Sequence, residues 1–274
     1  MRREWFILPL FVLLLIFCVQ AQNSAPLGTQ EGLHPAAPTR PYEPPSPAAT
    51  AQELAQRGDE FRGDKAYADA IEYYRAALLK THDPPGQASL LNRIGIAEMQ
   101  TQHLSDARKN LERALKKQRD FAEAHNNLGV VYYIQRKYAP AAAEYRKAIR
   151  LNDADASFHV NLGTNYFANK DYAHAMAEYQ RAVQLDPQIF EHKSRIGVSA
   201  QLSSPGDRAL FSYLLAKSYA QAGDNDRSLE YLKKAMEEGY PDIKNVYKDQ
   251  EFRELRQDPR FLSLMAAKPK AITE

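Results

Sequence analysis

A leucine–glycine or isoleucine–glycine pair recurs along the chain at a fixed interval of 34 residues. The pairs are Ile94-Gly95, Leu128-Gly129, Leu162-Gly163 and Ile196-Gly197. Arg57-Gly58 fits the same series upstream if a three-residue insertion follows it near Pro84. A chain that repeats one short unit at a fixed period folds as an array of like units, each packed on its neighbours.

Each unit carries further residues at constant distances from its glycine. Alanine follows twelve residues later, as Ala70, Ala107, Ala141 and Ala175, and again seven residues beyond that, as Ala77, Ala114, Ala148 and Ala182. A large side chain lies between them, as Tyr74, Leu111, Tyr145 and Tyr179. Apolar residues recur at helical spacing in two blocks of about 13 residues per unit, which predicts a pair of helices. Small residues let two helix backbones approach closely, and stacked pairs can bury the apolar faces that one pair cannot.

This pattern resembles the tetratricopeptide repeat over about residues 51 to 187, in four units. The resemblance implies an all-α fold, a right-handed superhelical α-solenoid of helix-turn-helix repeats with C-terminal capping helices. We predict repeats 1–4 plus an additional helix over residues 51–202 and a degenerate repeat pair over 203–238. Residues 239–274 are predicted to form a C-terminal cap and tail. A tail of this kind resembles those that follow many bacterial repeat arrays.

The first residues differ in composition from the rest of the chain. Arg2 and Arg3 precede an apolar run of 15 residues, Trp5 to Val19, and the run ends in the small or modest side chains of Val19-Gln20-Ala21. This is the pattern of a secretory signal peptide, which we predict over residues 1–21. The run is short for a membrane span of about 20 residues. The alternative is a short, uncleaved membrane anchor that tethers the protein.

Residues 22–50 are predicted to be a proline-rich disordered linker. They contain seven prolines and few large aliphatic side chains, so they cannot form a core that offsets the entropy of ordering. Cys18 is the only cysteine. Cleavage after Ala21 would leave the mature chain without disulfides or thiol chemistry.

The sequence contains no residue pattern that indicates catalysis. It has no glycine-rich phosphate loop, no HExxH and no GxSxG motif. His125 and His159 occupy equivalent positions in adjacent repeats, but a metal site would need more ligands. We therefore expect no enzyme activity, no catalytic residue, no metal and no cofactor.

The charge pattern has one local feature. The net charge of +2 favours no nucleic-acid partner. One predicted helix is nevertheless crowded with cations, namely Arg108, Lys109, Arg113, Lys116, Lys117 and Arg119. We interpret these as a solvated outer face, with contact to an anionic surface as the alternative.

The resemblance also implies a binding surface, because the first helix of each repeat in this family lines a concave groove that takes up peptide segments. Asn127 and Asn161 are equivalent, and a row of amides can bond to an extended peptide backbone. Met99, Tyr133 and Phe167 would form an apolar stripe beside that row. The predicted groove residues are Asn92, Arg93, Met99, Asn126, Asn127, Val130, Tyr133, Asn161, Thr164, Phe167 and Arg195.

We therefore predict a non-enzymatic adaptor or scaffold of the bacterial cell envelope that binds a protein or peptide partner. The alternatives are a self-associating structural envelope protein and a membrane-anchored assembly factor for secretion or pilus biogenesis. The expected location is the periplasm. Anchoring in the inner membrane facing the periplasm, or secretion, would follow from a different fate of residues 1–21.

Overall fold

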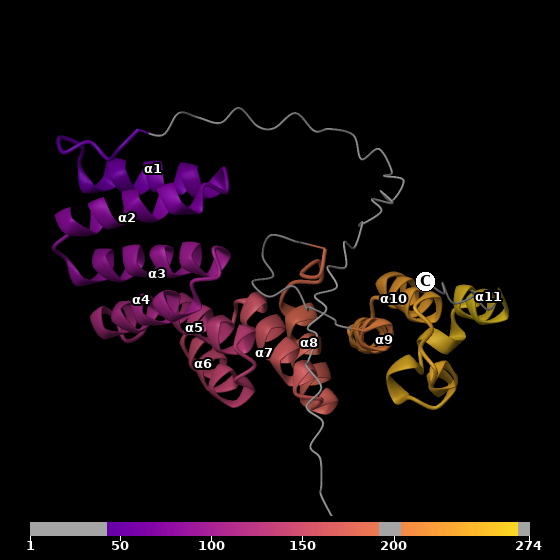
Figure 1. Ribbon diagram of the computed structural model, residues 1–274. Coiled ribbons are helices and arrows are strands. Elements are labelled where there is room, and N and C mark those ends of the chain that lie inside the picture. Colours follow the sequence, from indigo (N-terminus) through magenta and orange to yellow (C-terminus); the bar gives the residue numbers. More distant parts are fainter. Residues whose placement is uncertain (1–42, 192–203, 268–274) are drawn as a thin grey trace, which may run out of the picture. The chain divides into compact units, whose positions relative to one another are not determined.

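The computed structural model describes residues 43–191 and 204–267, which form helices and turns without a strand (Figure 1). Residues 1–43 and 44–274 form separate units, and all the described helices lie in the second. The predicted signal peptide, most of the predicted linker, and the Ile196-Gly197 pair lie outside the described residues. No helix within the described ranges is both long and apolar enough to cross a bilayer.

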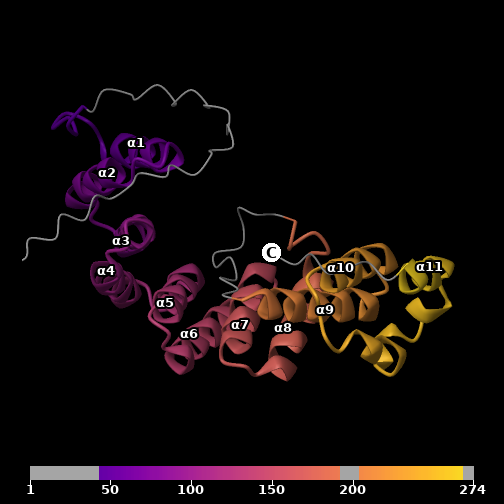
Figure 2. The same cartoon turned by 45° about the vertical axis from the view of Figure 1, so that its right-hand side comes forward.

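The helices follow one another in packed pairs, as the repeat predicts (Figure 2). Each helix packs chiefly on its pair partner, and each second helix then packs on the first helix of the next pair. The pairs are α1 (Ala51–Gly63) with α2 (Tyr67–Lys80), α3 (Pro84–Gln100) with α4 (Leu104–Lys117), α5 (Ala122–Ile134) with α6 (Tyr138–Leu151), α7 (Ala156–Ala168) with α8 (Tyr172–Leu185), and α9 (Pro205–Gln221) with α10 (Asn225–Glu237).

Side-chain caps fix where several helices begin. Thr50 forms a reciprocal capping box with Glu53 at the start of α1. Asp83 accepts a hydrogen bond from the Gly86 amide and is followed by proline in the first turn of α3. Asp171 and Asp224 cap α8 and α10 in the same way. These caps satisfy amides that have no partner within the helix.

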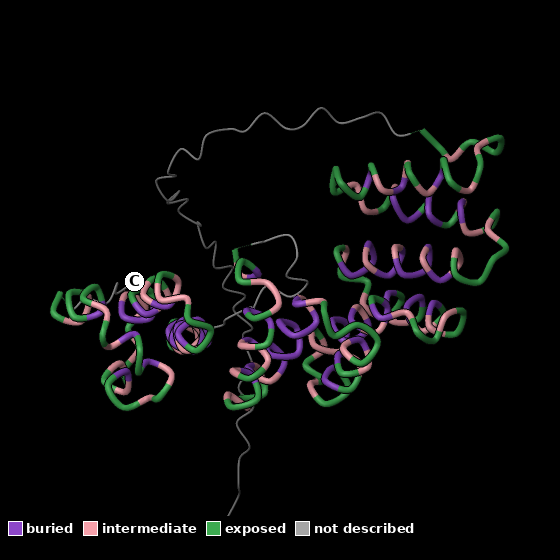
Figure 3. The backbone as a smooth tube through the Cα atoms, turned by 180° about the vertical axis from the view of Figure 1, so that it is seen from behind, coloured by how far each residue is buried: buried purple, intermediate pink, exposed green. Residues whose placement is uncertain are grey.

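In each of the first four pairs, the repeated glycine is where the two helices touch. A Cβ atom added to Gly129 would lie 2.7 Å from the Tyr145 ring, and one added to Gly163 would lie 2.6 Å from the Tyr179 ring. At Gly95 the corresponding neighbour is Leu111, at 2.8 Å. These partner side chains are fully buried. The constant spacing between glycine and large residue in the sequence is therefore a direct packing contact, and Figure 3 shows buried residues gathered where paired helices face one another.

A left-handed residue closes the turn inside each of the first four pairs. Lys65, Gln102, Arg136 and Lys170 have φ of 61°, 63°, 57° and 62°. The next backbone amide reaches back to the preceding helix, as when the Lys137 amide donates to the Tyr132 carbonyl at 2.9 Å. Gly223 has the same place between α9 and α10, where glycine adopts φ of 80° without steric cost.

This turn allows a stabilising substitution. Glycine at position 136 is expected to make the protein about 1 kcal/mol more stable than alanine there, because only alanine carries a Cβ into the left-handed region. Urea denaturation of Arg136→Gly and Arg136→Ala gives the difference in their free energies of unfolding. Both variants lack the arginine side chain, so its loss does not contribute to this difference. Equal stability of the two variants would contradict the expected strain.

An aromatic cluster joins the fourth pair to the fifth. The Phe211 ring of α9 lies 5.8 Å from Phe167, 5.4 Å from Tyr179 and 6.2 Å from Phe190 between ring centroids. All three contacts have the edge-to-face geometry that aromatic rings prefer. The Tyr219 hydroxyl also donates to the Pro187 carbonyl at 3.1 Å. These contacts hold α9 against α7 and α8.

Short helices cover the far side of α9 and α10. They are η1 (Ile243–Tyr247), η2 (Gln250–Phe252), η3 (Leu255–Gln257) and α11 (Pro259–Ala267). Phe252 and Phe261 are fully buried and pack in one core with Tyr213 of α9. The Tyr213 hydroxyl donates to Asp249 at 2.8 Å. This segment closes the apolar end of the stack, as expected of capping helices.

Candidate functional site

The first helices of successive pairs touch one another. Helix α5 packs on both α3 and α7, whereas the second helices of adjacent pairs make no comparable contact within the described residues. The first helices therefore lie closer together, on the inner side of this part of the stack. We call the surface formed by α1, α3, α5 and α7 the first-helix face.

Polar bonds run from helix to helix along this face. Asn127 Nδ2 donates to Asn92 Oδ1 at 2.9 Å, and Asn161 Nδ2 donates to Asn126 Oδ1 at 2.8 Å. The Arg93 guanidinium donates to the Asp59 carboxylate at 2.7 Å. We call these bonds the first-helix ladder. They connect α1 to α3, α3 to α5, and α5 to α7.

The ladder changes what the predicted row of amides can do. The structure brings these asparagines together, but as pairs, and Asn92, Asn126 and Asn161 are buried. Asn161 is only 1% exposed, and its Oδ1 has no hydrogen-bond partner among the described residues. Asn127 is half-buried, and the Arg93 side chain is 35% exposed. Those two residues keep surface that a partner could reach.

Most of the predicted apolar stripe is buried in the cores between repeats. Val130 and Thr164 are also buried, as are Met99 and Phe167. Met99 and Val130 share one core, and Phe167 packs in another with Tyr179. Residues of the same pair and of the next pair together cover these positions, which periodicity within a single helix cannot reveal. Arg195 lies outside the described residues.

Two residues of the first-helix face were not predicted from the sequence. Ile134 is 40% exposed at the end of α5, next to the partly exposed Tyr133. Asp59 receives hydrogen bonds from the Tyr74 hydroxyl and the Arg62 guanidinium as well as from Arg93. The sequence does contain a signal for the first-helix ladder. The two asparagines of each bonded pair are 35 residues apart, which is one residue more than the 34-residue repeat.

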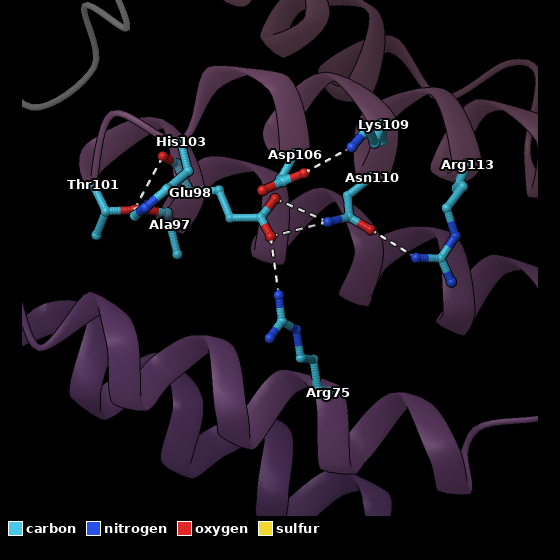
Figure 4. A network of polar contacts seen from close by, with 9 residues as sticks. All are labelled: Arg75, Ala97, Glu98, Thr101, His103, Asp106, Lys109, Asn110 and Arg113. Atoms are coloured by element: carbon cyan, nitrogen blue, oxygen red, sulfur yellow. Dashed lines mark hydrogen bonds and ion pairs between the residues drawn. The ribbon is translucent and has the colours of Figure 1, made fainter.

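A buried carboxylate links the first two pairs (Figure 4). Glu98 of α3 is 3% exposed and accepts from Asn110 Nδ2 of α4 at 2.9 and 3.1 Å. Arg75 of α2 donates to the same carboxylate at 3.3 Å. Burial raises the pKa of Glu98, and the hydrogen bond from Asn110 and the charge of Arg75 oppose this in part. The group holds three helices together.

The raised pKa of Glu98 gives a signed prediction. The folded state binds this proton more tightly than the unfolded chain, so stability falls as pH rises from the ordinary value of 4.5 through the raised pKa. Glu98→Gln removes the charge and keeps an oxygen for Asn110. We expect the variant to gain stability relative to the parent between pH 5 and pH 7, measured by urea denaturation. A stability difference that is the same at both pH values would rule out this titration.

The two equivalent histidines have structural partners within their own pairs. His125 Nδ1 lies 2.7 Å from Glu144, and His159 Nδ1 lies 2.7 Å from Glu178. Burial raises the pKa of Glu144, but hydrogen bonds from His125 and Lys147 outweigh it and lower the pKa overall. No group of three or more potential metal ligands occurs in the part of the chain that the structure describes.

The described helices form a solenoid of repeated helix pairs. Three tetratricopeptide repeat models match the sequence, at residues 92–156, 156–189 and 211–238. The chain is a tetratricopeptide repeat protein. This fold is typically a non-catalytic scaffold for protein interactions.

Several solved structures resemble this chain, while no curated protein sequence matches it. Residues 41 to the end of MamA from Desulfovibrio magneticus RS-1 are 16% identical, with a TM-score of 0.48 over 73% of this chain and 97% of that one. TTC0263, a thermophilic TPR protein in Thermus thermophilus, is 18% identical, with a TM-score of 0.48; the match covers 79% of this chain and 100% of that one. BtubC from P. vanneervenii is 20% identical, with a TM-score of 0.49; the match covers 72% of this chain and 80% of that one.

Proposed function

We propose that this protein is a non-enzymatic adaptor that binds an extended segment of a partner protein on its first-helix face. The observation that carries the proposal is a strip of accessible side chains on α3 and α5. Arg93 and Asn127 occupy equivalent positions on the two helices, and Ile134 lies two helical turns beyond Asn127 on the same side. Ile96 and Tyr133 are partly exposed beside them.

The chemistry of this strip suits a peptide. Asn127 uses its amide nitrogen in the first-helix ladder, which fixes the side chain before any partner arrives. Its Oδ1 makes no hydrogen bond within the described residues and can accept one from a peptide N–H. Ile134 and Tyr133 offer apolar area for a side chain of the partner. The other predicted groove residues would support this strip from beneath.

The proposal includes a location and an organisation. A cleaved signal peptide over residues 1–21 would deliver the protein to the periplasm, with residues 22–50 as a linker and the repeats starting at 51. Support for this comes from the charge and length of the N-terminal apolar run. N-terminal sequencing of the protein isolated from its native envelope tests it, because a first residue at Gln22 requires cleavage after Ala21.

A pair of matched variants tests the strip. Ile134 and Leu151 are exposed to similar extents, 40% and 44%, at the ends of α5 and α6. Ile134→Glu is expected to weaken binding of the partner at least about tenfold, because it buries a charge against an apolar side chain. Leu151→Glu should leave binding unchanged. Both are compared with the parent chain by capture from envelope extract, mass spectrometry and titration of the partner found.

The outcomes separate the remaining alternatives. Equal capture of one partner by all three proteins would refute the first-helix face as its site. Capture of only the chain itself would favour the self-associating structural protein.

A further inference from the structure

Among the second helices of this nearly neutral chain, net positive charge is concentrated on two neighbours. Helix α4 carries five cationic side chains and two carboxylates, and α6 carries three cationic side chains and one carboxylate. In α2, α8 and α10, the second helices of the other pairs, positive and negative side chains are equal in number. The excess therefore belongs to one place on the surface.

Much of this charge is not neutralised. Arg108 pairs with Glu112, Lys109 with Asp106, and Lys147 with Glu144. Within the described ranges, the remaining cations of this region have no carboxylate within ion-pair distance; they are Arg113, Lys116, Lys117, Arg119, Arg146 and Arg150. Such a group of like charges attracts an anionic partner.

The charges surround a hollow between α4, α5 and α6. Its volume is about 390 Å³, and its apolar wall is formed by the partly exposed Leu115 and, beneath it, the buried Leu128. Lys116, Arg119 and Lys147 line it as well. No lining residue belongs to the strip on the first-helix face, so the two surfaces are separate.

Three other polar groups line the same hollow, and each is already engaged. Glu112 accepts from Arg108 at 3.1 Å. Glu144 lies 2.7 Å from both His125 Nδ1 and Lys147 Nζ. His125 Nε2 also lies 3.1 Å from the Arg119 carbonyl. These contacts leave Lys116 and Arg119 as the cations free to meet a ligand.

We propose that this cationic hollow binds an acidic peptide segment of a partner protein. An apolar side chain of the peptide would pack chiefly on Leu115, while its flanking carboxylates pair with Lys116 and Arg119. The hollow combines a small apolar wall with unpaired cations, a chemistry that suits an acidic segment containing leucine-like residues.

Two other anionic partners fit the same observations less well. Single-stranded nucleic acid is held by aromatic stacking platforms. The exposed large hydrophobic residues of the described chain are Leu79, Ile134, Leu151, Tyr247 and Leu262; the one aromatic residue among them, Tyr247, lies on η1 and not on α4 or α6. A lipid bilayer is flat and would leave the hollow empty.

Fluorescence anisotropy with the full chain tests the proposal. The probe is a labelled peptide of repeated Glu-Glu-Leu triplets, compared with Lys-Lys-Leu and Glu-Glu-Ser peptides. We expect the first to bind most tightly and to weaken as salt rises, because the contacts are ionic. Lys116→Glu/Arg119→Glu should weaken binding by about tenfold or more. Lys244→Glu/Lys248→Glu, the same charge change on η1 and the residue after it, should bind like the parent.

Several outcomes would overturn the proposal. One is equal binding of the Glu-Glu-Leu peptide by the two double variants when circular dichroism shows both to be folded. Another is the absence of binding to any acidic peptide. Binding of phosphatidylserine vesicles or poly(dT) in its place, lost in Lys116→Glu/Arg119→Glu, would assign the surface to lipid or nucleic acid. Because Ile134→Glu leaves the hollow intact, it should bind the acidic peptide like the parent whatever the fate of the first-helix proposal.

Discussion

Alanine in place of Gly129 is expected to lower the free energy of unfolding by about 2–3 kcal/mol. The new Cβ would lie 2.7 Å from the buried Tyr145 ring, which fills the space between α5 and α6 and cannot move aside. The loss is expected despite the better helix propensity of alanine, worth about 1 kcal/mol. Gly63, with nothing within 4 Å of an added Cβ, is the control, and Gly63→Ala should not destabilise.

A double-mutant cycle isolates this contact. Tyr145→Ala alone should cost about 3–5 kcal/mol, since it empties a fully buried aromatic site. In that background Gly129→Ala should become neutral or stabilising, because the ring it strikes is gone. Urea denaturation of the four proteins gives the coupling energy. Strictly additive costs would mean that the glycine serves some purpose other than admitting the ring.

Removal of the Phe211 ring is expected to have the second large effect. Phe211→Ala should cost about 3 kcal/mol, near the lower end for a large aromatic residue because this ring is only partly buried. The loss of stability should be confined to the contact between the pair α7–α8 and the pair α9–α10, because in a repeat stack each pair is stabilised by its neighbours. Hydrogen exchange should therefore show earlier opening of α9, α10 and the capping helices, with α1–α6 unchanged.

A conservative replacement is the control for this contact. Phe211→Leu keeps most of the apolar contact and loses only the edge-to-face geometry with Phe167, Tyr179 and Phe190, so its cost should be below about 1.5 kcal/mol. Uniform loss of protection along the whole chain in Phe211→Ala would show that the stack unfolds as one unit.

The fold could be predicted from the sequence because its signals are local and repeated. The spacing from Gly129 to Tyr145 is the same as that from Gly163 to Tyr179, and each pair of residues forms one contact between two helices of one repeat. The left-handed turns were not predicted, since Lys65, Gln102, Arg136 and Lys170 are not residue types that indicate them.

The candidate site could be predicted only in part, because its positions depend on contacts between repeats. Asn127 and Asn161 are equivalent in the sequence, yet one is half-buried and the other is buried. The difference arises from what packs beside each helix, which a pattern within one repeat does not contain. The same holds for Met99 and Phe167, whose burial comes in part from the adjoining pair. The cations of α4 were evident in the sequence, but the hollow that they line was not.

The first-helix ladder has a direction, and this bears on how such a chain can lengthen. Residues 122–155 contain one donor for the preceding unit, Asn127, and one acceptor for the following unit, Asn126. A tandem copy of this segment, inserted after Asp155, would find the acceptor it needs on one side and the donor it needs on the other. Gene duplication could thus add a repeat here without any compensating substitution, and the surface available to partners would grow by one unit at a time.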